Sequence, residues 1–344
     1  RKPLQWYIHE GLQFQTASLP APWHLLVGIL LAKNLSFSLK IKLLSDMSAL
    51  QRWAGHHKTD LTVAKWLRTR NVPRSLLGQF WQPLVWGALN TPLEQASLRI
   101  LCNVLNDGVW SEKANSDYLL PKQDLGRIVA EPALDFLHKH GAKIHLETRV
   151  SDLNHHIDGR IEINGEVFDA VILAVAPYHV DALLPEDTPD YIQTAYQSLH
   201  YHAITTVYLR YAQAVKLPAP LTGFADGTAQ WVLHRGALGL PDNEVAVVIS
   251  VSDYVEAWKD KDLAEKIHAD IKRICPDLDK PEAVRIITEK RATTAATVDF
   301  VQPDFSWLHH RRIYPAGDYL HPRYPATLEA AVQSGFAAAE KLRS

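Results

Sequence analysis

The residues best suited to do chemistry lie near the end of the chain. Gly317 and Asp318 follow a short apolar segment, and Pro325 precedes an alanine-rich stretch with helical spacing. A glycine lets the backbone approach a ligand closely, and a carboxylate accepts hydrogen bonds from hydroxyl groups. A proline suits the first helical turn, whose free N–H groups and partial positive charge attract a phosphate or an electron-rich ring edge. The pattern predicts a site for an elongated anionic ligand, although an ordinary strand, turn and helix would share it.

Composition limits the other chemistry. The 344 residues include 36 Lys and Arg against 38 Asp and Glu, so no excess positive charge favours nucleic acid. Cys102 and Cys275 match no metal or redox spacing, which favours a reducing, cytoplasmic location. Neighbouring histidines point apart on a helix or a strand, so we predict no metal site at the three adjacent pairs, His56-His57, His155-His156 and His309-His310.

The elements that must position these residues begin with a helical region over 20–140. Pro73 and Pro92 stand where a first helical turn accepts proline. Apolar residues recur at helical spacing near 39–54, 62–70, 74–90, 92–107 and 124–140.

Strands are expected after this region. Residues 142–150 alternate as a half-buried strand, Asp158-Gly159 marks a hairpin turn, and 168–175 is a short apolar strand that stops at Pro177. Further strands are expected at 200–211, 229–234, 244–251 and 283–290, with a helix at 254–274. We predict two interleaved domains, one from 1–119 and 181–282 and the other from 120–180 and 283–344.

The start of the chain has two notable features. It begins Arg1-Lys2-Pro3 without a methionine or a signal peptide, so we expect it to be the remainder of a longer protein. The apolar run at 23–32 is about half of the roughly 20 residues that span a bilayer. It is therefore expected to be a core helix or an interfacial one.

Several stretches resemble a known family. Ala-Gly-Asp at 316–318 and Tyr-Pro-Ala-Thr-Leu-Glu-Ala-Ala-Val-Gln-Ser-Gly at 324–335 resemble the C-terminal flavin-binding signature of the FAD-dependent amine oxidase and phytoene desaturase superfamily. Stretches 19–26, 81–92 and 115–121 are similar to the squalene-associated FAD-dependent desaturases, also called hydroxysqualene dehydroxylases, of bacterial hopanoid synthesis. The resemblance runs over nearly the whole chain.

This resemblance implies a fold and a cofactor. The fold class would be α/β (α+β), with an incomplete FAD-binding Rossmann-like domain interleaved with a helix-rich substrate domain that contains a mixed sheet. The cofactor would be FAD. The superfamily holds its pyrophosphate with a Gly-x-Gly-x-x-Gly turn, and this motif occurs nowhere in the chain. We therefore expect the N-terminal dinucleotide-binding unit to be missing, which would leave Val171, Leu173 and Val175 bare.

The resemblance also implies cofactor-binding residues. Val150 would meet the adenine, and Ala174 and Pro177 would belong to the turn beside the dinucleotide, although strand packing explains all three equally well. The residues carried over to the flavin itself are Gly317 and Asp318 at the pyrophosphate and ribityl chain, and Thr327, Leu328 and Glu329 at the helix start facing the pyrimidine ring.

The implied reaction removes the allylic hydroxyl of hydroxysqualene to give squalene, which needs an acid and a flavin hydride. We predict Asp117 as the acid to test first, and a turn carboxylate is the alternative. Asn90 would orient a hydroxyl or cap a helix. The long apolar substrate would suit a tunnel lined by Trp81, Leu84, Trp86 and the run at 23–31, which core packing explains almost as well.

Two other classes of function stay open from the sequence. The chain could be another flavoenzyme of the superfamily, a carotenoid desaturase or an amine oxidase. It could instead be a non-catalytic remnant that lacks FAD, as the missing glycine turn suggests. For the enzyme we expect an unidentified reductant, and a cytoplasmic protein with peripheral contact to the inner membrane through the run at 23–31.

Overall fold

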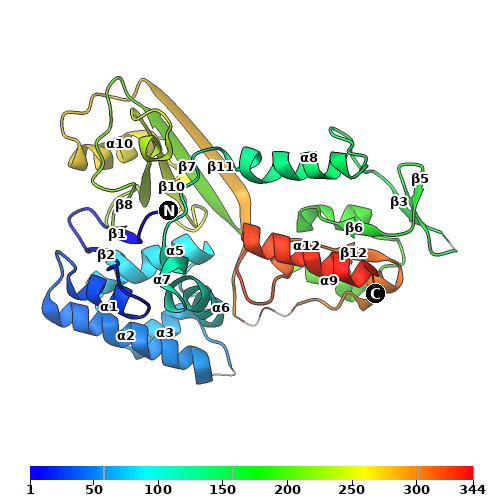
Figure 1. Cartoon of the computed structure of the whole chain (residues 1–344), viewed down its shortest axis with the longest axis horizontal. Helices are drawn as coiled ribbons and strands as arrows, with labels where there is room; N and C mark the ends of the chain where they lie inside the picture. The colour runs from blue at the N-terminus through cyan, green and yellow to red at the C-terminus, as the bar shows by residue number, and fades with distance from the viewer. Residues whose placement is uncertain (57–58, 157, 299, 301, 344) are drawn as a thin grey trace. The chain divides into compact units, whose positions relative to one another are not determined.

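The computed structural model describes residues 1–56, 59–156, 158–298, 300 and 302–343, so His57 lies outside it. The chain forms two compact units, each built from two separate stretches (Figure 1). Unit 1 contains Arg1–Asp124 and Tyr201–Asp299, and unit 2 contains Leu125–His200 and Phe300–Ser344. The chain passes from one unit to the other after residues 124, 200 and 299. The domain boundaries predicted from the sequence were after residues 119, 180 and 282. The division of flavin and substrate binding between them stays a prediction.

The N-terminal part of unit 1 is helical. The helices predicted at 39–54 and 62–70 are confirmed as α2 (Phe37–His56) and α3 (Val63–Thr69). Thr62 caps α3 by accepting the Lys65 N–H. The other elements here are α1 (Trp23–Leu30), α4 (Arg74–Leu76), the π-helix η1 (Leu77–Trp81), α5 (Gln82–Leu89), α6 (Leu98–Leu105), the π-helix η2 (Asn106–Trp110) and α7 (Lys113–Ser116).

The two predicted helix-opening prolines differ in outcome. Pro73 directly precedes α4, and the predicted helix at 74–90 is confirmed as the run α4, η1 and α5. Pro92 lies in a turn instead, where its carbonyl accepts N–H groups from the next residues. The helix predicted at 92–107 therefore begins late, as α6, with Ser97 accepting the Ile100 N–H as its cap.

A five-stranded sheet completes unit 1, with β7 running through it in Figure 1. Its order is β11 (Ala283–Thr294), β7 (Tyr201–Arg210), β10 (Glu244–Ile249), β9 (Trp231–His234) and β8 (Leu221–Gly223), and β1 (Gln5–Tyr7) pairs separately with β2 (Gln13–Gln15). The predicted α/β class is confirmed, but the sheet predicted as mixed is antiparallel in all its pairs. Its hairpin connections from β8 to β9 and from β9 to β10 explain this, because parallel neighbours need a crossover.

Helix α10 (Leu263–Ile274) covers one face of this sheet. Its fully buried Ile267 and Ile271 pack with the buried valines of β7 and β10. The helix was predicted from 254, which is wrong, because 253–260 is held in turns and in the 3-10 helix η7 (Ala257–Lys259). A further 3-10 helix, η6 (Arg235–Leu238), follows β9.

Unit 2 is built from short strands and helices. Strand β6 (Val171–Leu173) pairs in parallel with β12 (Ile313–Pro315), and α12 (Leu328–Arg343) packs beside β12. Its other elements are the π-helix η3 (Gly126–Ala130), α8 (Glu131–Lys139), β3 (Leu153–His155), β4 (Ile161–Ile163), β5 (Glu166–Phe168), the 3-10 helices η4 (Pro177–His179), η5 (Asp181–Leu183) and η8 (Asp318–Leu320), α9 (Asp190–Gln197) and α11 (Ser306–His310).

Predictions for unit 2 were only partly correct. The turn at Asp158-Gly159 is confirmed, because β3 and β4 pair antiparallel around it and Gly159 has φ +82°. The helix predicted at 124–140 is confirmed as η3 and α8. The strand predicted at 142–150 is wrong, since no described strand lies beside that segment to complete a ladder. The strand predicted at 168–175 is shortened to β6.

Unit 2 exposes many apolar side chains. Leu173 was expected to be bare but is buried, because it points into the core around Ile313; its neighbour Ile172 is exposed instead. Along η3 and α8 no residue is buried. The large apolar side chains exposed on or near these helices are Leu125, Ile128, Val129, Phe136, Leu137 and Leu146. Such a surface favours association in solution.

Candidate functional site

Unit 1 contains a cavity of about 330 Å³. It lies where α5 meets the loop between β8 and β9 and the segment that leads into α10. Its aromatic walls come from Trp86, Trp231 and Phe224. A volume of this size is at the lower end of small-molecule sites, which are typically lined by apolar and aromatic side chains.

The aromatic wall has one unsatisfied polar atom. The indole Nε1 of Trp86 is buried and has no hydrogen-bond partner among the described residues. Trp231 is held edge-on against Trp6, with ring centroids 5.2 Å apart. The cavity lining thus combines these aromatic side chains with polar ones, among them Gln82, Thr228 and Gln230.

Of the residues predicted for a substrate tunnel, Trp86 lines this cavity, whereas Trp81, Leu84 and the run at 23–31 do not. Trp81 is fully buried in the helical core, with its ring 5.6 Å from that of Trp66. Leu84 packs against the same core while half-buried. Core packing therefore accounts for Trp81 and Leu84. The sequence did not indicate Trp231 or Phe224, because the cavity arises only when α5 meets residues about 140 positions away.

Asn90 supports the segment that closes the sheet side of the cavity. It ends α5 in the left-handed conformation, with φ +43° and ψ +42°, which asparagine tolerates well. Its Nδ2 donates to the His202 carbonyl oxygen at 3.2 Å and to Thr293 Oγ1 at 2.9 Å, and its Oδ1 accepts the Val251 N–H at 2.7 Å. Both amide protons are used, so a helix-ending and tethering role explains Asn90. A role with a substrate hydroxyl stays a prediction.

The residue held by Asn90 is itself unusual. Val251 has φ +51°, a conformation that costs a β-branched residue about 1–3 kcal/mol and persists only when its surroundings enforce it. Val251 is fully buried and lies two residues after the end of β10, whose Ile249 lines the cavity. The Asn90 hydrogen bond is thus one enforcing contact.

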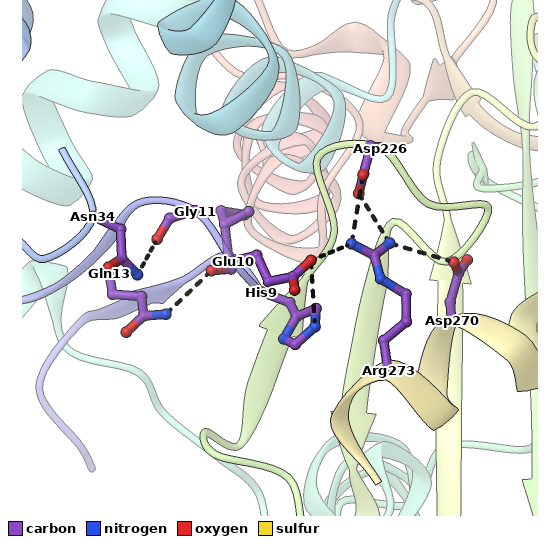
Figure 2. A network of polar contacts seen from close by, with 9 residues as sticks. His9, Glu10, Gly11, Gln13, Asn34, Asp226, Asp270 and Arg273 are labelled. Atoms are coloured by element: carbon purple, nitrogen blue, oxygen red, sulfur yellow. Dashed lines mark hydrogen bonds and ion pairs between the residues drawn. The ribbon is translucent and has the colours of Figure 1, made fainter. Parts of the chain in front are cut away.

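A polar network supports the opposite wall of the cavity (Figure 2). Arg273 on α10 reaches Glu10 at 2.7 Å, Asp226 at 3.1 Å and Asp270 at 3.8 Å. Its hydrogen bond holds the pKa of Glu10 below the usual value. Asp270 also accepts the Ala229 N–H at 2.9 Å. The network fixes the loop that carries Phe224 into the cavity wall.

Asp117, the predicted acid, directly follows α7 and pairs with Lys113, whose Nζ lies 3.3 Å from its Oδ1. It does not line the 330 Å³ cavity. The same two charges act on His24, which is fully buried in α1 with neither ring nitrogen hydrogen-bonded among the described residues. No local pattern links His24 to Asp117, because the two residues are 93 positions apart in the chain.

His24 makes folding sensitive to acid. Burial lowers its pKa, the Lys113 ammonium lowers it further, and the Asp117 carboxylate opposes the shift. The unfolded chain therefore takes up this proton more readily than the folded one. The contribution of neutral His24 to the unfolding free energy is fully present above about pH 6.5. It is lost as the pH falls through that value toward the lower pKa of His24 in the folded protein. Burial lowers the pKa of His268 and His309 in the same direction.

We therefore expect His24→Leu to flatten the fall in unfolding free energy between pH 7 and pH 5. At pH 7 its stability should stay close to the parent's, because the change removes two buried nitrogens without partners. Urea unfolding at several pH values measures the unfolding free energy at pH 7 and its fall toward pH 5. The exposed His56→Leu serves as the control and should follow the parent. An unchanged slope in His24→Leu would contradict the assignment.

In unit 2 the predicted glycine and acid form a tight corner. The Gly317 N–H donates to Ser334 Oγ of α12 at 2.8 Å, and η8 packs on that helix. A Cβ at Gly317 would overlap the Tyr319 ring, 2.7 Å from Cδ1 and closer still to Cε1. Packing against Tyr319 therefore explains the glycine, and the predicted approach to a ligand stays a prediction. Burial raises the pKa of Asp318, opposed by the backbone N–H groups of Asp318 and Tyr319.

The start of α12 is open to solvent. Thr327 accepts the Ala330 N–H with its Oγ1 at 3.2 Å, while Leu328 and Glu329 are exposed. The helix begins at Leu328, three residues after Pro325, which had been predicted to open it. A cavity of about 230 Å³ lies farther along α12, and neither Asp318 nor the helix start lines it; its lining includes Phe305, His309, Pro315, His321, Ser334 and Lys341.

The three remaining cofactor candidates differ in local structure and in burial. Val150 is exposed and lies in irregular chain rather than at a strand end. Ala174 directly follows β6 and is exposed, and the buried Pro177 opens η4. The structure therefore corrects the local conformation predicted at Val150, while contact of all three with a dinucleotide stays a prediction.

Two general features complete the description of the sites. No three His, Cys, Asp or Glu side chains within the described ranges lie close enough to hold a metal ion. Among the described helices, none combines the length and apolar character needed to cross a bilayer.

Comparison with known proteins covers almost the whole chain. The profile of the family described as flavin containing amine oxidoreductase matches residues 7–343. Hydroxysqualene dehydroxylase of Rhodopseudomonas palustris is 28% identical over 79% of this chain and 64% of its own length. That of Zymomonas mobilis is 25% identical over 75% of this chain and 61% of its own length. The chain thus spans about three fifths of the length of these curated relatives, and the predicted resemblance to them is confirmed.

Solved structures show the same fold. Wild-type putrescine oxidase bound to putrescine superposes with a TM-score of 0.68 at 13% identity, over 100% of this chain and 83% of that one. Cyclohexylamine oxidase from Brevibacterium oxydans gives 0.65 at 14% identity, over 99% and 81%. With the family profile matching from residue 7 to residue 343, the chain belongs to the flavin-containing amine oxidoreductase family.

Proposed function

We propose that the protein is an FAD-dependent oxidoreductase that converts hydroxysqualene to squalene in hopanoid and isoprenoid biosynthesis. The observation that carries this proposal is the match of three curated hydroxysqualene dehydroxylases to about three quarters of the chain. In this reaction the allylic C–O bond breaks, a C–H bond forms at the same carbon, and the hydroxyl leaves as water after taking up a proton. A reductant, unidentified here, would restore the two electrons.

The C-terminal segment of unit 2 fits a flavin better than the segment near Val150 does. The exposed start of α12 presents free N–H groups, and Asp318 supplies carboxylate oxygens at the corner packed on the same helix. We propose that this corner contacts the ribityl chain and pyrophosphate, and that Thr327, Leu328 and Glu329 face the pyrimidine ring. FAD bound there, once reduced by the reductant, would supply the hydride.

The 330 Å³ cavity supports an apolar substrate rather than an amine. Among the described residues that line it, the acids are Glu256 and Asp260, and both are paired with lysines, Lys259 at 2.9 Å and Lys266 at 2.5 Å. The charge of an amine would therefore find no unpaired carboxylate there and would depend on the aromatic rings alone. We propose that Trp86, Trp231 and Phe224 bind part of the isoprenoid chain.

Asp117 remains our proposed proton donor to the leaving hydroxyl. We expect Asp117→Asn to lower kcat by about 100-fold, as loss of a general acid does, with the FAD content of the protein unchanged. Rapid quench of hydroxysqualene turnover measures kcat, and flavin absorbance measures FAD. Lys113→Gln is the matched control, because it removes the ion-pair partner of Asp117 but keeps the carboxylate. Equal kcat in Asp117→Asn and the parent would reject the acid.

The overall proposal is tested by reconstitution and a product assay. The purified chain, incubated with FAD and reduced, should give squalene from hydroxysqualene and leave phytoene and simple amines unchanged. Turnover of an amine alone would make it an amine oxidase of the same family. Turnover of phytoene alone would make it a carotenoid desaturase.

A non-catalytic protein without FAD is the second candidate. It is favoured by the absence of Gly-x-Gly-x-x-Gly from the sequence and by the irregular course of 142–150. A colourless protein that cannot be reconstituted with FAD would support this candidate.

We also propose that the protein is cytoplasmic and contacts the inner membrane peripherally. The support is the chemistry of the substrate, because a long isoprenoid dissolves in the bilayer rather than in water. We propose that the helices near residues 23–31 make this peripheral contact with the membrane surface.

A further inference from the structure

The helices α1 and α2 of unit 1 carry an unusual group of exposed apolar side chains. Trp23 is 56% exposed at the start of α1, and Leu31 is 75% exposed directly after its end. Phe37, the first residue of α2, is 71% exposed, and Ile41 lies one turn further on the same side. The two helices pack against each other and lie side by side in Figure 1. We call this group, together with the exposed Leu19, the α1–α2 surface.

Helix α1 is apolar on both sides. Its inner side buries Leu25 and Ile29 in the core of unit 1. The outer side of α1 carries Trp23, Val27 and Leu30, which are spaced four and three residues apart. Each of these side chains is at least partly exposed. A surface helix of a soluble protein is normally polar on its outer side, so this side is suited to an apolar surrounding.

The charge of this region has one sign. Residues 11–45 contain Lys33, Lys40 and Lys42 but no Asp or Glu. Lys42 is neutralised by Asp46 at 2.6 Å. Lys33 is exposed, and Lys40 donates to the Leu30 carbonyl oxygen at 3.0 Å, which places its cation at the end of α1. Two cations thus border the α1–α2 surface and complement an anionic partner.

We propose that the α1–α2 surface docks on an anionic lipid bilayer, with its apolar side chains in the headgroup boundary and Lys33 and Lys40 at the phosphates. A tryptophan at the edge of an apolar patch with nearby lysines is typical of such interfaces. Helix α1, with 8 residues, is about 12 Å long and suits lying in the interface. The inference deepens the proposed function and rests on it, in that a membrane-dissolved substrate gives the docking its purpose.

A second apolar surface, on α8 of unit 2, provides a matched comparison. Phe136 is 60% exposed there, similar to Phe37. Helix α8 carries the acids Glu131 and Asp135 against the single Lys139, so its net charge is negative and anionic lipid would repel it. We therefore expect α8 not to contribute to binding of anionic vesicles.

The test is flotation of the purified chain with vesicles of phosphatidylcholine containing 30% phosphatidylglycerol, and with pure phosphatidylcholine. The parent should float with the anionic vesicles. Leu31→Glu/Phe37→Glu should reduce binding at least tenfold, because both side chains would carry charge into the boundary. Phe136→Glu, the matched control on α8, should bind as the parent does. Circular dichroism confirms that each variant is folded.

The charge contribution is tested separately. Lys33→Gln should weaken binding to anionic vesicles about fivefold, since one lysine near the surface contributes about 1 kcal/mol. Added salt should reduce this difference.

Three outcomes would overturn the inference. They are full flotation of Leu31→Glu/Phe37→Glu, loss of flotation in Phe136→Glu, and a parent that does not float but forms a dimer that Leu31→Glu/Phe37→Glu dissociates. The last would assign the α1–α2 surface to a second copy of the chain. Flotation needs neither FAD nor turnover, so its failure is distinct from failure of the proposed reaction.

Discussion

Replacing Asn90 by alanine should lower the unfolding free energy by about 3 kcal/mol. The change leaves the buried Val251 N–H without its acceptor at 2.7 Å and removes the donor to His202 and Thr293. A buried donor left without a partner costs about 1–3 kcal/mol, and the lost bonds add to that. Alanine also tolerates the left-handed conformation at this position less well than asparagine.

The measurement is urea unfolding followed by tryptophan fluorescence. Nine of the ten tryptophans fall within the ranges of unit 1, so the signal reports mainly on the unit that contains Asn90. Asn115→Ala is the matched control, because its amide is exposed and donates only to Ser111. That variant should change stability by less than about 0.5 kcal/mol. A midpoint for Asn90→Ala equal to that of the control would show that the network is not stabilising.

The effect of Asn90 should extend to the cavity. Val251 holds its positive φ against an intrinsic cost of about 1–3 kcal/mol, so the lost hydrogen bond lets the segment after β10 relax. The cavity wall formed by β10 and the following residues would then lose its fixed shape. Asn90 acts through Val251, which makes it a positioning residue for the proposed substrate site.

The predictable parts of the fold are those specified by local pattern. Helices α2 and α3 were predicted because apolar residues recur at helical spacing, and β7, β9 and β10 because apolar residues run through them. Errors arose where neighbours decide the outcome. Residues 142–150 have the alternation of a strand, but a strand needs a partner for its hydrogen bonds.

The site was predictable to a different degree. The corner at Gly317 and Asp318 was predicted from its residue types and from a family resemblance, and its position against α12 agrees with that interpretation without testing it. The cavity residue Trp231 and the supporting residue Val251 were not predictable, because their roles depend on contacts with α5 and with Asn90, far away in the chain, that no local pattern encodes. A positive φ at a valine leaves no trace in the sequence at all.

Gly317→Ala should destabilise unit 2 by about 2 kcal/mol, because the added Cβ overlaps the buried ring of Tyr319. That ring is held edge-on to Tyr196, with centroids 5.9 Å apart, and cannot move freely. Hydrogen exchange of peptides covering 313–320, read by mass spectrometry, measures the loss locally. In a Tyr319→Leu background the same glycine change should cost little, since the overlapping atoms are gone.

This double-variant cycle separates packing from ligand binding at Gly317. If the glycine also lets FAD approach, Gly317→Ala in the Tyr319→Leu background should retain its protection from exchange yet bind FAD at least tenfold more weakly than Tyr319→Leu alone. Equal FAD affinity would leave packing as the whole explanation of the glycine. An equal stability cost with and without the tyrosine ring would instead refute the packing explanation, because the three atoms nearest to the added carbon belong to Tyr319.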